Sequence, residues 1–90
     1  MPFTGFPGGD LIGAGLADLT RGIESIPALL VSIGAPRLRR LGLAVPVPLR
    51  DAEHRLYQLL ATEGADAAHW RYNALIRRLV SFERAAECAR

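Results

Sequence analysis

The sequence predicts an all-α fold, an irregular bundle of four main helices. Half of the 90 residues are hydrophobic, and Leu and Ala are abundant, which favours helices. Apolar residues recur at spacings of three and four in several segments, and Gly or Pro residues separate these segments. A chain of this length is expected to form one domain. The predicted helices cover residues 10–21, 25–33, 51–63 and 66–88, and a short additional helix could form at 36–41.

The N-terminal part is predicted to be a tail followed by a helix. Residues 1–9 contain two Pro and three Gly, so we expect a flexible or loosely docked tail, which Phe3 and Phe6 could pin onto the domain. In the helix at 10–21, Asp10 is the expected N-cap. Gly13 and Gly15 each weaken this helix by roughly 1 kcal/mol relative to Ala. Their presence predicts that another helix approaches closely there.

The middle of the chain is predicted to contain a helix, a break and an extended connector. Ser25 is the expected cap of the helix at 25–33, and Gly34 is expected to end it. Pro36 should prevent a smooth continuation, although a short helix could restart there and close before the connector. Residues 43–50 alternate Pro with apolar residues and favour a polyproline-like connector between two helical hairpins. Residues 10–90 would then form a single helical domain.

The C-terminal half is predicted to be a pair of antiparallel helices. Asp51 is the expected cap of the helix at 51–63, and Gly64 its end. The turn before the helix at 66–88 is very short, so the two helices should pack antiparallel. The predicted core consists of Leu16, Leu19, Leu29, Leu30, Ile33, Leu38, Leu41, Leu56, Leu59, Leu60, Tyr72, Leu75, Ile76, Leu79 and Phe82.

Charge and cysteine content limit the class of protein. The formal net charge of +2 is too small to indicate a nucleic-acid partner by itself. All basic residues are Arg, which suits two-pronged binding of carboxylate or phosphate, although codon bias explains the same composition. The single Cys88 excludes an internal disulfide and a Cys-rich zinc site. The start of the chain lacks signal-peptide features, and no apolar run approaches ~18 residues, so we expect a cytoplasmic protein without a membrane segment.

The residues that could perform catalysis or bind a metal are scattered. His54, His69 and Cys88 have no evident partner in the sequence to orient them, so we expect a non-enzyme with no catalytic residues and no cofactor. The sequences DAEH (51–54) and DAAH (66–69) place an Asp three residues before a His. Such a pair could share a metal, but it provides fewer than the three or four ligands of a zinc site. A helix cap explains the same spacing, and no metal is expected.

Glu83 is an unusual residue in the last predicted helix. It falls among apolar residues on the predicted inward side, where a carboxylate must be paired or protonated. An Arg from the segment 36–41 could meet it. Glu63 occupies a similar position in the preceding helix. Alternatively, both carboxylates lie at the edge of the apolar stripe, since charged residues are rarely fully buried.

The last predicted helix also carries the candidate binding surface. Trp70 lies opposite the inward side, in line with Arg77 and Arg84, and we predict that these residues bind a partner. A solvated face with Trp70 folded back over the preceding turn explains the same pattern. Five other arginines could contact phosphate or an acidic partner: Arg37, Arg39, Arg40, Arg71 and Arg78.

The expected function is that of a small non-catalytic protein-interaction or adaptor module, whose partner is another protein or a second copy in a homodimer. The alternative is a nucleic-acid-associated regulator that places the same arginines on phosphate. A helix-turn-helix around Gly34 fits poorly, because its second element would contain only about six residues. Salt distinguishes the two functions, since phosphate binding weakens steeply as salt rises.

Overall fold

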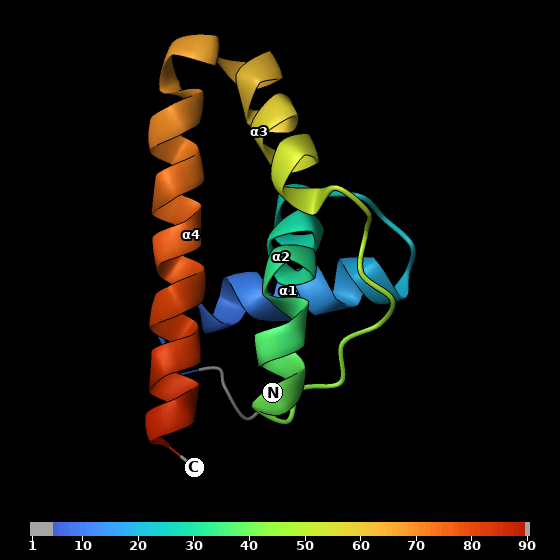
Figure 1. The fold of residues 1–90 in the computed structure, drawn as a ribbon, viewed down its shortest axis with the longest axis vertical. Helices are drawn as coiled ribbons and strands as arrows, with labels where there is room; N and C mark the ends of the chain where they lie inside the picture. Colours follow the sequence, from blue (N-terminus) through green and yellow to red (C-terminus); the bar gives the residue numbers. More distant parts are fainter. Residues whose placement is uncertain (1–4, 90) are drawn as a thin grey trace.

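The computed structural model describes residues 5–89 and confirms the all-α prediction. It contains four helices, α1 (Gly9–Thr20), α2 (Ile26–Arg40), α3 (Ala52–Glu63) and α4 (Ala65–Cys88), and no strand within the described residues. As Figure 1 shows, α3 and α4 run antiparallel, as the short turn at Gly64 predicts. The domain measures 38 × 25 × 18 Å along its principal axes.

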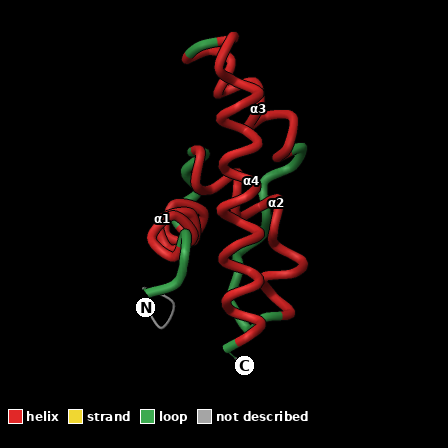
Figure 2. Tube along the Cα trace, turned by 90° about the vertical axis from the view of Figure 1, so that its left-hand side faces the viewer, coloured by secondary structure: helices red, strands yellow, loops and turns green. Residues whose placement is uncertain are grey.

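The central element is α2, which packs against all three other helices. It lies beside α4, and α3 continues beyond its N-terminal end (Figure 1). In Figure 2, α1 is seen end-on, because it crosses the other helices at a steep angle. A helix with neighbours on so many sides cannot keep a single apolar stripe. Its buried residues are Ala28, Leu29, Leu30, Val31, Ser32, Gly34, Ala35 and Leu38.

The predicted break in the second helix is wrong, because α2 continues through Gly34 and Pro36. Gly34 does not end the helix but lies where α2 meets α4: a Cβ atom there would be 2.8 Å from Leu79 Cδ1. Pro36 is exposed, so its ring faces solvent and the helix loses one backbone hydrogen bond. The short helix predicted at 36–41 is therefore the C-terminal part of α2, which ends before Gly42 with its φ of 99°.

Of the three predicted caps, Ser25 is confirmed, Asp10 is wrong, and Asp51 is right in position only. Ser25 does cap α2, since its hydroxyl accepts a hydrogen bond from the Ala28 amide at 3.2 Å. By contrast, α1 begins after Gly8, which has a φ of 73°, so Asp10 lies in the first turn. Asp51 precedes α3 with a φ of 52° and makes no side-chain capping hydrogen bond. A left-handed backbone at a non-Gly residue turns the side chain away from the usual capping geometry.

The close approach predicted for the first helix occurs at Gly15. A Cβ atom there would overlap the backbone carbonyl of Pro27 and the side chain of Val31. Gly15 is buried, whereas Gly13 is half-buried. Gly15 thus lets α1 cross α2 with the two backbones almost in contact, a contact that any side chain at this position would prevent.

The core agrees with the prediction only in part. Nine of the predicted positions are buried: Leu19, Leu29, Leu30, Leu38, Leu41, Leu56, Leu60, Leu79 and Phe82. Leu16, Ile33, Leu59, Tyr72, Leu75 and Ile76 are half-buried and pack against this core. The prediction missed several buried residues, including Ile12, Ala28, Val31, Ala35 and Leu43. Most of these lie on sides of α1 and α2 that a one-sided stripe leaves out.

The connector and the N-terminal segment are both attached to the domain. Arg39 donates hydrogen bonds to the carbonyls of Val45 and Pro46, each at 3.1 Å. The amide of Leu49 donates to the hydroxyl of Ser32 at 3.0 Å, so the connector is attached to α2 both in its middle and near its C-terminal end. The Phe6 ring is half-buried, 6.1 Å from that of Phe82. Phe3 lies outside the described residues.

Candidate functional site

The outer face of α4 carries the three residues predicted to bind a partner. We define this face as Trp70, Ala74, Arg77, Ser81, Arg84 and Cys88, all of which are exposed. The Trp70 side chain is 74% exposed, on the side of the helix opposite the buried Leu79 and Phe82. Arg77 and Arg84 follow it at intervals of seven residues, which is two helical turns or a rise of about 10.5 Å.

The arginines of α4 differ in how their charge is compensated. Arg71 forms an ion pair with Glu63 at 2.8 Å, and Arg78 lies 3.7 Å from the carboxylate of Asp10. Within residues 5–89, Arg77 and Arg84 form no ion pair and no side-chain hydrogen bond. The outer face of α4 therefore carries uncompensated positive charge, whereas Arg71 and Arg78 pair with carboxylates of α3 and α1.

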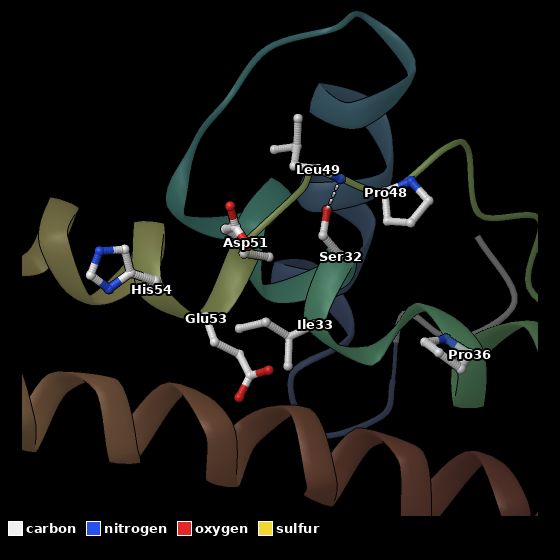
Figure 3. Close-up of a pocket in the computed structure, with 9 residues that line it drawn as sticks. Ser32, Ile33, Pro36, Pro48, Leu49, Asp51, Glu53 and His54 are labelled. Carbon is white, nitrogen blue, oxygen red and sulfur yellow. Dashed lines mark hydrogen bonds between the residues drawn. The ribbon is translucent and has the colours of Figure 1, made fainter.

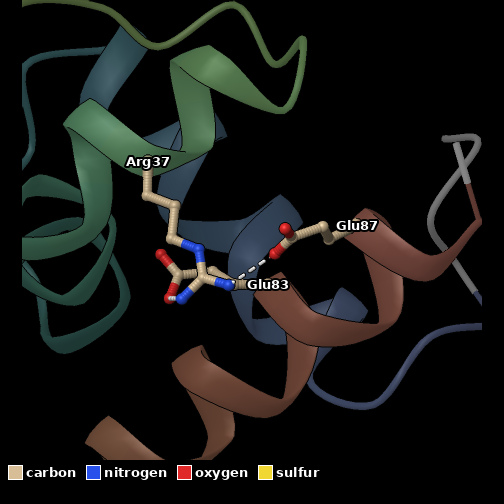
Figure 4. Close-up of polar contacts among 3 residues, drawn as sticks. All are labelled: Arg37, Glu83 and Glu87. Carbon is tan, nitrogen blue, oxygen red and sulfur yellow. Dashed lines mark hydrogen bonds and ion pairs between the residues drawn. The ribbon is translucent and has the colours of Figure 1, made fainter.

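The arginines at the end of α2 are partly used by the fold as well. Arg37 makes a hydrogen-bonded ion pair with Glu87 at 2.8 Å and lies 3.6 Å from Glu83 (Figure 4). Arg39 binds the connector through backbone carbonyls. Arg40 is exposed. This cluster joins α2 to α4 and to the connector, so Arg37 and Arg39 would have to give up these contacts before they could bind a partner.

Glu83 is buried and paired, whereas Glu63 is not buried. Glu83 is 4% exposed, and one of its carboxylate oxygens lies 3.6 Å from Arg37. Burial raises the pKa of the Glu83 carboxyl, and the nearby Arg37 and Arg40 lower it only in part. Glu63 is exposed and pairs with Arg71. The expectation that an Arg of segment 36–41 meets Glu83 is thus confirmed, and the edge position applies to Glu63 alone.

A cavity of about 620 Å³ lies where the connector enters α3, and no pattern in the sequence predicts it. Figure 3 shows Ser32 of α2 pointing toward Leu49 at the end of the connector, and Ile33 and Pro36 of α2 also line the cavity. The Ser32 hydroxyl is fully engaged, because it donates to the Ala28 carbonyl at 2.8 Å and accepts from the Leu49 amide. The remaining lining residues are Pro48, Leu49, Asp51, Ala52, Glu53 and His54.

The residues considered for catalysis do not come together. His54 lies in the first turn of α3, and His69, 3.1 Å from the Asn73 amide nitrogen, follows the far end of that helix. Cys88 is at the opposite end of α4 from His69, about 28 Å away along the helix axis. Across residues 5–89, no group of three His, Cys, Asp or Glu side chains could hold a metal ion.

Comparisons of the chain with protein-family models, with curated proteins and with solved structures give no match. Among the described residues, no helix combines the length and the apolar character needed to cross a membrane.

Proposed function

We propose that this protein is a small non-catalytic interaction module that binds another protein through the outer face of α4. The observation that carries the proposal is Trp70, whose side chain is 74% exposed although the fold has an apolar core available. Trp and Arg, with Tyr, are the residue types most enriched among those that dominate binding energy at protein interfaces. A Trp in such a contact would bury a large apolar area.

The surroundings of Trp70 support the same function. Arg77 and Arg84 continue the surface along the helix and are free to pair with groups of a partner. Ala74 lies between Trp70 and Arg77, and Ser81 lies between Arg77 and Arg84. Their small side chains leave the helix accessible to a neighbouring element. The surface is rigid, since it belongs to a helix of 24 residues that packs on both α2 and α3.

Nucleic acid remains the second candidate partner, because an aromatic ring beside unpaired arginines can stack on bases and contact phosphate. The low net charge of +2 weighs against it. So do the intramolecular contacts of Arg37, Arg39, Arg71 and Arg78, which leave few arginines for phosphate.

The test is an affinity isolation with tagged protein and two matched variants. Trp70→Ser removes the aromatic side chain from the outer face of α4. Val47→Ser is the control, because Val47 is 86% exposed but belongs to the connector on the other side of the domain. We expect a bound protein to be lost with Trp70→Ser and retained with Val47→Ser. The proposal fails if the bound material survives Trp70→Ser, or if nuclease treatment removes it.

A further inference from the structure

We infer that the partner of the outer face of α4 is an acidic helix, with carboxylates at intervals of seven residues along the side that faces this protein. This inference rests on the proposed function and names the class of partner for the same surface. It draws on three properties of the outer face: its spacing, the size of its side chains and its charge.

The spacing of the outer face is that of a helix–helix seam. Trp70, Arg77 and Arg84 recur every seven residues, and Ala74, Ser81 and Cys88 follow each of them by four. Alternating intervals of four and three residues keep side chains along one line of a helix, as in coiled coils. Because one position of each repeat is small, a second helix can approach α4 closely while lying between the larger side chains. All six residues are exposed, so nothing in the described chain occupies this seam.

The charge of the seam selects the partner. Arg77 and Arg84 carry two positive charges that no carboxylate of residues 5–89 compensates. A second copy of this chain, packed parallel and in register on this face, would bring the same arginines against them, and like charges in an interface cost binding energy. A guanidinium group binds a carboxylate through two parallel hydrogen bonds, so an acidic side chain suits each position.

The length of the seam sets the size of the partner. From Trp70 to Arg84 the helix rises by about 21 Å. A partner helix of about four turns spans this distance. Two carboxylates about 10.5 Å apart would face the two arginines, and an apolar side chain would cover the Trp70 ring.

The test uses two synthetic helical peptides of 28 residues with the same apolar stripe. One carries Glu and the other Lys at the flanking positions, seven residues apart. Binding is measured by titration at 50 and 200 mM salt, with a 20-base-pair DNA duplex as a third probe. The proteins are the full chain, Trp70→Ser, the double variant R77E/R84E, and the matched variant R21E/R50E. The last changes the net charge equally at two exposed arginines outside α4.

The inference predicts that the Glu peptide binds the wild-type chain and R21E/R50E alike, about tenfold more tightly than it binds R77E/R84E. The Lys peptide should show the reverse preference. If both peptides bind equally and neither binds Trp70→Ser, the acidic partner is wrong, but the proposed interaction module is still supported. If the wild-type chain self-associates and Trp70→Ser does not, the acidic partner is wrong and the partner is a second copy of this chain. Binding of the duplex alone would overturn both proposals, and no binding by any probe would overturn the acidic helix.

Discussion

Replacing Gly15 by Ala tests the tightest contact of the fold, the crossing of α1 over α2. In an exposed helix this change stabilises by about 1 kcal/mol, because Ala restricts the unfolded chain and favours the helix. Here the added methyl group would overlap the Pro27 carbonyl and the Val31 side chain. The Pro27 carbonyl is backbone and cannot rotate away, so α1 must move. Overpacking of this kind costs roughly 1–3 kcal/mol, which exceeds the gain in helix propensity.

The assay is urea denaturation of the Gly15→Ala variant beside the wild-type chain. We expect the free energy of unfolding to fall by about 1–3 kcal/mol and the melting temperature to fall by roughly 5–20 °C. Ala14→Gly calibrates the intrinsic propensity, because Ala14 is an exposed neighbour in the same helix, and it should lose about 1 kcal/mol. If Gly15→Ala is as stable as the wild type or more stable, α1 does not cross α2 at this residue.

Three further predictions concern α4. The pKa of Glu83 is raised by burial, so folding favours its protonated form. The resulting stability is present below the unfolded pKa of about 4.3 and is lost as the pH rises through the higher folded pKa. Gln does not titrate, so the unfolding free energy of Glu83→Gln minus that of the wild type should increase as the pH rises from 4 to 7. A difference that does not change with pH would contradict this. Trp70 should emit like free indole in water, since it is 74% exposed, and a clearly blue-shifted emission maximum in dilute protein would mean that it is buried. Phe82→Ala should lose about 3–5 kcal/mol in urea denaturation, because the ring is fully buried, and a loss below about 1 kcal/mol would refute its place in the core.

Local sequence signals predicted where the helices lie but placed the end of α2 too early. Gly34 and Pro36 together read as a helix end, because each weakens a helix on its own. Their effect was outweighed by packing: Gly34 admits α4, and Leu30, Val31 and Leu38 around it are completely buried. A propensity argument cannot include contacts with residues more than forty positions away.

The candidate site was more accessible to prediction than the interior. The helical period alone places Trp70, Arg77 and Arg84 opposite the buried face, and the structure finds them exposed. The pairing of Glu83 could be expected from its apolar neighbours, but the choice of Arg37 depends on how α2 lies against α4. The cavity beside His54 could not be expected, since three segments form it and the backbone turn at Asp51 is unusual.

The Pro36 in α2 also bears on the order in which the chain folds. A peptide of 15 residues is only a marginal helix in water, and an internal Pro and Gly reduce its helicity further. We therefore expect that the central helix does not form first and does not serve as a template for the others. Its helicity depends on α1, α3 and α4, and each of these packs against it. Folding of this domain is then expected to be concerted, with helix formation in α2 and tertiary packing around it occurring in one step.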